Sequence, residues 1–123
     1  MSFFNNNQLQ PINTTQITCR TYKQFYPNIN PVIYELSIYT AQSNIYTVVY
    51  ITGENFFPYG TTTINFGTTY KNIPITYFSS SYVSFVLPGN VMSGNYNIQV
   101  VNITPCMLNS GYLYSNIMVF AII

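Results

Sequence analysis

TVVYITGENF, residues 47–56, is the stretch of sequence that decides the fold. β-Branched and aromatic side chains dominate it as far as Thr52, as they do in strands. A strand is therefore expected over residues 45–53. From Pro31 onward no segment has the 3.6-residue period of an amphipathic helix, so this part of the chain is expected to be all-β.

The same kind of pattern recurs at a regular spacing along the chain. Turn signals separate the segments, among them Pro58-Tyr59-Gly60, Pro88-Gly89-Asn90 and Asn109-Ser110-Gly111. Seven short strands with such punctuation predict two antiparallel sheets packed as a β-sandwich. The predicted strands cover residues 32–40, 45–53, 62–67, 70–78, 82–87, 95–102 and 112–122.

Alternation within the strands indicates which side chains face the core, because successive side chains of a strand point to opposite faces. The residues expected to face inward are Ile64, Phe66, Val83, Phe85, Leu87, Tyr96, Ile98 and Val100, and those expected to face outward are Asn65, Ser84, Asn97 and Gln99. The closing segment Ile117–Ile123 is apolar on both faces. Either its outer face is covered, or it forms an exposed adhesive edge.

Residues 1–30 differ from the rest of the chain. They contain NNNQLQ (5–10), Pro11 and Pro27, and no sustained periodicity. We expect an N-terminal extended arm that becomes ordered only against a neighbour, or an ordinary flexible terminus, followed by a sandwich domain over residues 31–123. The first ten residues lack the basic and apolar regions of a secretory signal, and no apolar run reaches about 18 residues, so neither a cleaved leader nor membrane insertion is expected.

Charge is unusually sparse, at 4% of residues and a net charge of +1. The ionisable side chains of the ordinary kinds are Arg20, Lys23, Lys71, Glu35 and Glu54. General acid–base catalysis, a zinc site and phosphate neutralisation each need clustered ionisable or ligating groups. The sequence therefore predicts no enzyme, no metal, no cofactor and no nucleic-acid partner.

The missing charge has two interpretations. Abundant Asn, Ile and Tyr suggest an AT-rich genome, but such a genome would also supply many lysines, and Lys and Arg together number 3. One interpretation is a tolerant surface with compositional drift. The other is a surface that is mostly covered in a larger assembly, because low net charge favours association.

Residues 47–56 resemble the signature of the IPT/TIG family of immunoglobulin-like domains, an apolar-alternating strand closed by Gly-x-Asn-Phe. Ser37–Asn44 departs from the family pattern, because it lacks the Pro- and Gly-rich segment before the second strand. The other matching segments, in family order over about residues 31–123, are Pro31-Val32-Ile33, Ile64-Asn65-Phe66-Gly67, Val86-Leu87-Pro88, residues 96–102 and Ser115-Asn116.

The resemblance implies a seven-stranded immunoglobulin-like β-sandwich whose signature residues are structural. Gly53 is expected to supply a backbone conformation that a side chain would hinder, and Phe56 to close one end of the core. The family has no common active site, and its members serve as interaction modules in receptors, transcription factors, carbohydrate-active proteins and virion proteins. Fold alone therefore does not select a function.

Cys19 and Cys106 are either free thiols or a disulfide that ties the arm to the loop between the sixth and seventh strands. Such a bridge would contribute about 4 kcal/mol in the chain-entropy model. Asn13-Thr14-Thr15 and Asn102-Ile103-Thr104 match the glycosylation sequon, although chance matches are expected in so Asn- and Thr-rich a chain.

Together these features favour a non-enzymatic structural protein of a virion, a minor or accessory capsid protein of a large DNA virus. Its expected partners are other subunits of the assembly or further copies of itself. Outward Tyr50, Tyr82, Asn97 and Gln99 are the expected contact residues, because tyrosine gives a large, rigid contact at low entropic cost. The alternative is an extracellular or cell-surface adhesion module that binds glycans through tyrosines and amides.

Overall fold

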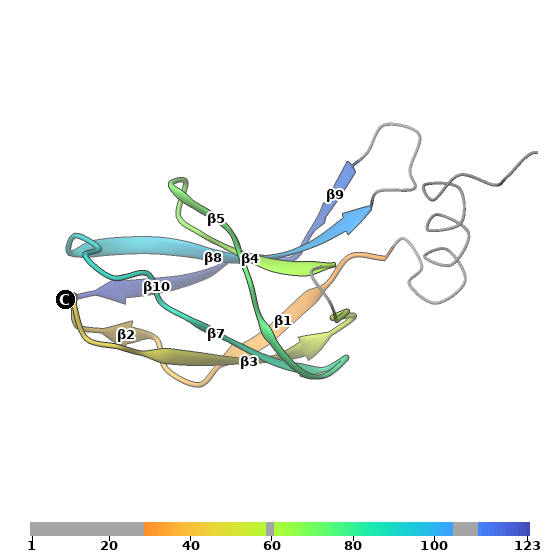
Figure 1. The fold of residues 1–123 in the computed structure, drawn as a ribbon, viewed down its shortest axis with the longest axis horizontal. Coiled ribbons are helices and arrows are strands. Elements are labelled where there is room, and N and C mark those ends of the chain that lie inside the picture. Colours follow the sequence, from red (N-terminus) through yellow and green to blue (C-terminus); the bar gives the residue numbers. More distant parts are fainter. Residues whose placement is uncertain (1–28, 59–60, 105–110) are drawn as a thin grey trace, which may run out of the picture.

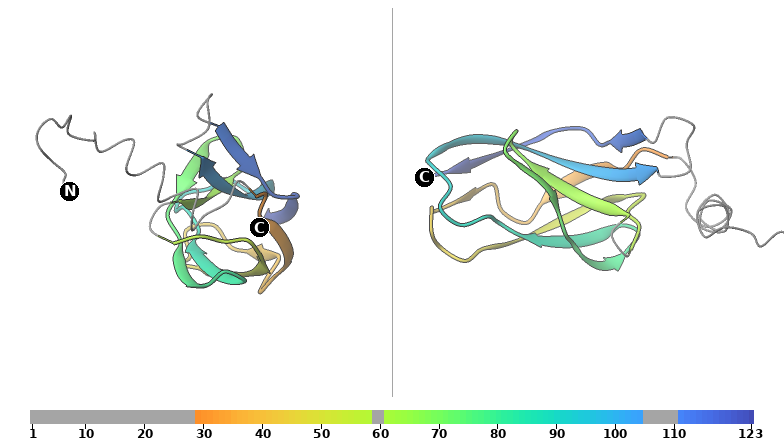
Figure 2. Two further views of the ribbon diagram at one scale, coloured as in Figure 1. Left: turned by 90° about the vertical axis from the view of Figure 1, so that its right-hand side faces the viewer. Right: turned by 45° about the horizontal axis from the view of Figure 1, so that its top comes forward.

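The computed structural model describes residues 29–58, 61–104 and 111–123, and this part of the chain is a sandwich of two β-sheets (Figures 1 and 2). Sheet A has the order β1-β3-β7-β6, and all its strands are antiparallel. Its strands are β1 (Val32–Leu36), β3 (Val48–Glu54), β7 (Tyr82–Val86) and β6 (Thr76–Ser79). The predicted all-β sandwich is confirmed.

In sheet B the order of neighbouring strands is β2-β10-β8-β4-β5. The strand β9 also pairs with β8, past the segment of β8 that pairs with β10. Figure 1 shows β8 along the length of the sandwich, with β10 beside one end and β9 beside the other. The pairing of β10 with β2 is parallel and the other pairings are antiparallel. The strands are β2 (Thr40–Ala41), β10 (Met118–Ile122), β8 (Gly94–Thr104), β4 (Thr62–Phe66), β5 (Tyr70–Ile73) and β9 (Gly111–Tyr114).

The predicted first strand, residues 32–40, is divided between the sheets. β1 ends where Ser37 bonds back to β3: its N–H donates to the Tyr50 carbonyl at 2.8 Å, and its Oγ accepts from the Tyr50 N–H at 2.9 Å. The chain then crosses to sheet B, where the Tyr39 carbonyl accepts from the Ala121 N–H at 3.0 Å. The prediction of one continuous strand is wrong because these partners lie far away in the sequence.

The predicted fourth strand, residues 70–78, is likewise two strands, β5 in sheet B and β6 in sheet A. Pro74 lies between them and has no N–H to donate to a ladder, so a continuous strand is disfavoured there. Figure 1 shows the chain passing from one layer to the other at this point.

The predicted closing strand, residues 112–122, is interrupted at Ser115–Ile117. Ser115 bonds to Val100 twice, by accepting from its N–H through Oγ at 2.8 Å and by donating its own N–H to the carbonyl at 2.9 Å. Asn116 bonds to Ile33 in sheet A: Oδ1 accepts from the Ile33 N–H at 2.8 Å, and Nδ2 donates to the Ile33 carbonyl at 3.0 Å. The Asn116 side chain therefore takes the place of a strand partner for Ile33 and links the two sheets.

The core lies between the sheets and is filled by the inward faces of both. The inward residues predicted on β4, β7 and β8 are buried, except that Tyr96 is half-buried and stacks on Phe66 at a centroid distance of 4.9 Å. The largest fully buried side chains are those of Phe56, Phe66, Phe85, Phe120, Ile51, Ile64 and Ile98.

Ser84 points outward as expected but is buried, and the closing strand is exposed on its face rather than at an edge. Ser84 lies opposite Tyr50 on the outer face of sheet A, yet it is only 4% exposed. The closing strand β10 is not an edge, since β2 and β8 flank it. Its outer face is instead open, with Val119 54% and the following Ile123 66% exposed.

The Gly-x-Asn-Phe turn ends β3 through a left-handed residue, which is Asn55 (φ 66°) rather than Gly53. Asparagine adopts this conformation more readily than other residues with side chains. The expected hindrance to a side chain at Gly53 is present, but it does not come from backbone conformation, because Gly53 has no positive φ. Its role is steric, because the side chain of Phe56 and the backbone of β1 lie against it.

Candidate functional site

The predicted contact residues lie on opposite faces of the sandwich. Tyr50 on β3 and Tyr82 on β7 point outward from sheet A, whereas Asn97 and Gln99 on β8 point outward from sheet B. The two tyrosines and Asn97 are exposed, and Gln99 is half-buried. The four residues therefore belong to two separate surfaces.

On sheet A, three rings form what we call the aromatic cluster: Tyr50, Phe78 and Tyr82. The Tyr50 and Tyr82 rings stack at 5.8 Å with an interplanar angle of 14°, and Phe78 lies 5.4 Å from Tyr82. Stacked rings at such distances attract one another beyond simple burial of area. The rings remain 37%, 53% and 40% exposed for Tyr50, Phe78 and Tyr82 respectively, so the cluster is an open surface that covers Ser84.

The ladder register builds this cluster. Tyr50 and Tyr82 are diagonal neighbours, because Tyr50 pairs with Ser84 and Tyr82 pairs with Thr52. Phe78 joins them through the irregularity in the β6–β7 pairing between Tyr77 and Ser79. Exposed Val86 extends the same apolar face, since it pairs with Val48.

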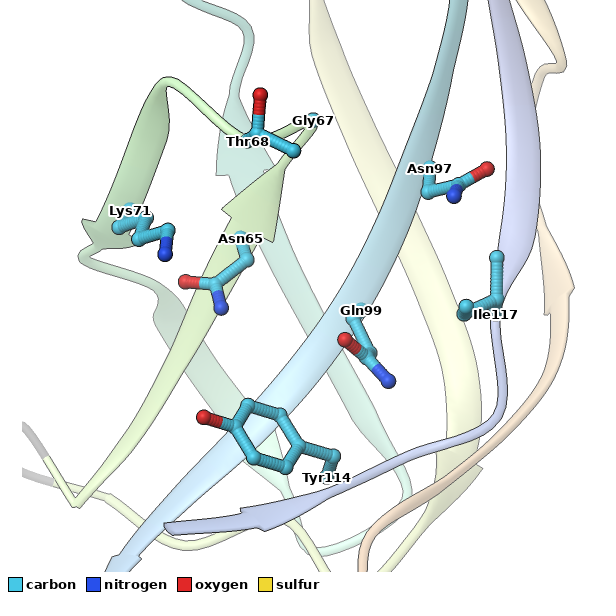
Figure 3. Close-up of a pocket in the computed structure, with 8 residues that line it drawn as sticks. All are labelled: Asn65, Gly67, Thr68, Lys71, Asn97, Gln99, Tyr114 and Ile117. Atoms are coloured by element: carbon cyan, nitrogen blue, oxygen red, sulfur yellow. The ribbon is translucent and has the colours of Figure 1, made fainter.

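On sheet B, a hollow of about 320 Å³ lies over β4, β5 and β8, and we call it the amide hollow. Figure 3 shows its lining, with Asn65 and Gln99 on the floor and the Tyr114 ring beside them. A second hollow of about 210 Å³ adjoins it and shares Asn65, Lys71 and Tyr114. The lining of the first is Asn65, Gly67, Thr68, Lys71, Asn97, Gln99, Tyr114 and Ile117.

Backbone partners fix the orientation of two floor amides. Asn65 and Gln99 pair directly in the β4–β8 ladder. Asn65 Oδ1 accepts from the Asn72 N–H at 3.2 Å, and Gln99 Nε2 donates to the Ser115 carbonyl at 2.9 Å. An N–H can only donate and a carbonyl can only accept, so neither amide can be reversed. The Asn65 Nδ2 donor and the Gln99 Oε1 acceptor are therefore available to a ligand.

The wall of the amide hollow comes from Tyr114 on β9, and the neighbouring Tyr112 lines the second hollow. Tyr114 pairs with Val101 and Tyr112 with Ile103, so both tyrosines stand on the outer face. They are 46% and 52% exposed, and their ring centroids are 6.3 Å apart at an angle of 41°. Lys71 on β5 is the ammonium group of the lining.

Comparison with known families decides what kind of domain carries these surfaces. The model of the IPT/TIG domain matches residues 31–120. The chain belongs to the IPT/TIG domain family. Domains of this immunoglobulin-like family are generally non-catalytic and mediate protein–protein interactions. No curated protein sequence matches the chain.

The acidic and basic side chains that the structure describes in this IPT/TIG domain do not gather. In residues 29–58, 61–104 and 111–123 no three His, Cys, Asp or Glu side chains lie together as metal ligands would. Glu35, Glu54 and Lys71 are exposed. Within the same residues no helix is long and apolar enough to cross a bilayer.

Asn102, the acceptor of the second sequon, is a structural residue of the IPT/TIG domain. It is fully buried, and its Nδ2 donates to the carbonyls of Ile29 at 3.1 Å and Asn55 at 2.9 Å. Its Oδ1 accepts from Thr62 Oγ1 at 2.6 Å. In the folded domain this amide cannot carry a glycan. The first sequon, at Asn13, and both Cys19 and Cys106 lie outside the described residues.

Sequence reasoning missed several side chains of both surfaces. Phe78 was hidden because the β6 irregularity breaks the alternation. Tyr112, Tyr114 and Lys71 meet the floor amides only because β9 and β5 flank β8 and β4 in sheet B. Asn65 lies opposite Gln99, so the polar floor of the amide hollow was predictable once β4 and β8 were paired.

Proposed function

We propose that this IPT/TIG domain is a non-enzymatic, protein-binding subunit of a larger assembly, and that it contacts its neighbours through the aromatic cluster. The observation that carries the proposal is the exposure of Tyr50, Phe78 and Tyr82 side by side on an open sheet face. Soluble monomers rarely leave large contiguous apolar patches open, and aromatic residues are enriched in protein interfaces.

The outer face of the closing segment, residues 117–123, adds to this adhesive character. Ile117, Val119 and Ile123 are each at least half exposed, at 50%, 54% and 66%. Across the whole chain the net charge is +1, so little electrostatic repulsion opposes association.

The assembly we propose is the virion of a large DNA virus, with this chain as a minor or accessory capsid protein. The AT-biased but lysine-poor composition and the near-absence of charge support this choice. The predicted arm supports it further, because its last two residues are held firmly. The Ile29 carbonyl accepts from Asn102 Nδ2, and the Asn30 carbonyl accepts from Asn55 Nδ2 at 3.1 Å. An arm leaving from so fixed a point could gain order on a neighbouring subunit.

The test is quantitative mass spectrometry of purified particles, which gives the ratio of this chain to the main capsid protein. A constant ratio between preparations supports the proposal, and absence from particles overturns the virion assignment. A Tyr50→Ser, Tyr82→Ser double variant should be excluded from particles. The matched control Tyr112→Ser, Tyr114→Ser should be incorporated, because it alters the opposite sheet.

A deletion tests the arm separately. It should remove residues 1–28 and keep Ile29 and Asn30, whose carbonyls accept hydrogen bonds within the sandwich. The shortened chain should keep its circular dichroism spectrum and lose its place in the particle. Normal incorporation would show that the arm contributes nothing to assembly.

A second candidate function is an extracellular or cell-surface adhesion module that binds glycans. The amide hollow is the observation that favours it, because its floor consists of uncharged amides whose donors and acceptors match hydroxyl groups.

A further inference from the structure

We infer that the amide hollow is a binding site for a neutral oligosaccharide. The inference develops the glycan-binding candidate, and it is independent of the aromatic cluster, which lies on the opposite sheet. A domain can therefore hold a neighbour through sheet A and a sugar through sheet B.

The floor of the hollow matches a pair of adjacent hydroxyl groups. Asn65 offers a free N–H donor and Gln99 a free carbonyl acceptor, from directly paired positions of the ladder. A hydroxyl both donates and accepts, so neighbouring sugar hydroxyls can satisfy the two groups together. Within the described residues the Asn97 side chain makes no hydrogen bond, so it leaves a complete amide for the ligand.

The orientation of the floor is set before a ligand arrives. The Asn72 N–H holds Asn65 and the Ser115 carbonyl holds Gln99, so neither amide has to be ordered on binding. Polar groups held in place in this way lower the entropic cost of recognition.

The wall supplies an apolar surface of the right kind. Tyr114 lies beside the floor amides in Figure 3, and Tyr112 stands next to it at 6.3 Å. An exposed ring can pack on the C–H face of a pyranose, while its hydroxyl bonds to the rim of the sugar. The two neighbouring rings can each face one of two linked sugar units.

Charge contributes little to recognition in the amide hollow. Lys71 is the sole ammonium of the lining and no carboxylate faces it there, so the hollow can satisfy hydroxyl groups and has one cation to offer an acid. Polyanions such as nucleic acids need several cations placed together.

Saturation-transfer NMR on the full chain tests the site, with maltose, cellobiose, chitobiose and N-acetyllactosamine as probes. Each probe is used at about 10 mM, because so few contacts predict a Kd of about 1 mM or somewhat tighter. At least one probe should give a signal, and amide shifts in an ¹⁵N spectrum should map to β4, β8 and β9.

Matched variants then locate the contact. Tyr114→Ala should weaken binding by about tenfold, which corresponds to about 1.4 kcal/mol. Asn97→Ala should weaken it by about fivefold, as for one lost hydrogen bond. Tyr82→Ala, at a tyrosine of comparable exposure on sheet A, should leave affinity unchanged, and melting curves should show all three variants folded.

Three results would overturn the inference. The first is silence from every neutral probe, and the second is a set of shifts that maps to sheet A. The third is binding restricted to the acidic probe sialyllactose and abolished by Lys71→Ala, which would make the hollow an anion site. None of these results bears on incorporation into particles, so the two proposals fail separately.

Discussion

The ring of Phe56 occupies the space that a side chain on Gly53 would need. A methyl group on Gly53 would lie 2.6 Å from Cζ of Phe56 and 1.9 Å from the carbonyl oxygen of Val32 on β1. The Gly-x-Asn-Phe sequence is thus a packing device. Gly53 lets β1 and the Phe56 ring approach β3, and Asn55 makes the left-handed turn that brings the ring back over the strand.

Replacing Gly53 with alanine should therefore destabilise the domain strongly. We expect Gly53→Ala to lower the free energy of unfolding by about 3 kcal/mol, at the upper end for overpacking, because a backbone oxygen cannot rotate away. Urea denaturation gives the measurement. The matched control is Gly89→Ala, where nothing lies within 4 Å of the added methyl group. Gly89→Ala should change stability by less than about 0.5 kcal/mol, and equal losses at both sites would contradict the steric explanation.

Phe56 is the other residue in the contact with Gly53, and its ring closes one end of the core. It is fully buried, so Phe56→Ala should cost about 3–5 kcal/mol, as for other buried aromatic truncations. Asn97→Ala removes an exposed side chain and should cost less than about 0.5 kcal/mol. Thermal melts of both variants compare the inward and outward assignments directly, and similar losses would show that one of them is wrong.

The sequence sufficed for the sandwich because alternation is a local property. Which residues of β4, β7 and β8 face the core can be read from their immediate neighbours. The divided strands could not be predicted in this way. Ser37 ends β1 by bonding to Tyr50, and Asn116 interrupts the closing strand by bonding to Ile33, 83 residues earlier. Only the assembled sandwich brings these partners together.

The surfaces were predictable in the same partial sense. Alternation points Tyr50 and Asn97 outward, but the order of strands in each sheet decides that they face opposite directions. Asn102 shows the limit of a motif. Glycosylation at a sequon needs an accessible asparagine. Asn102 is instead buried, and its side chain forms hydrogen bonds with Ile29, Asn55 and Thr62.

Thr63 offers a prediction of increased stability. Among the described residues its Oγ1 is a buried side-chain oxygen without a hydrogen-bond partner. An unpaired buried hydroxyl costs about 1–3 kcal/mol, so Thr63→Val should raise the free energy of unfolding by about 1 kcal/mol. Its neighbour is the control, because Thr62 Oγ1 donates to Asn102 and accepts from the Phe57 N–H at 2.7 Å. Thr62→Val should cost about 2 kcal/mol. A loss at both positions would mean that Thr63 has a partner, such as a bound water.

The buried amide of Asn102 gives the last prediction, which concerns both stability and modification. Asn102→Asp keeps the shape and the acceptor for Thr62, but it removes the donor that serves the Ile29 and Asn55 carbonyls. A carboxylate would then face two carbonyl oxygens in a fully buried site, so we expect a loss of about 3–5 kcal/mol.

Asn97→Asp makes the same chemical change at an exposed position and should cost less than about 0.5 kcal/mol. Chemical denaturation compares the two variants. Expression in a glycosylating host, followed by intact-mass and peptide analysis, tests the second consequence. Asn102 should be unmodified in folded protein, because a glycan on Nδ2 would break the bonds that hold Ile29 and Asn55 to β8. A glycan on Asn102 in folded protein, or equal stability of the two Asp variants, would show that the Asn102 hydrogen bonds do not stabilise this end of the sandwich.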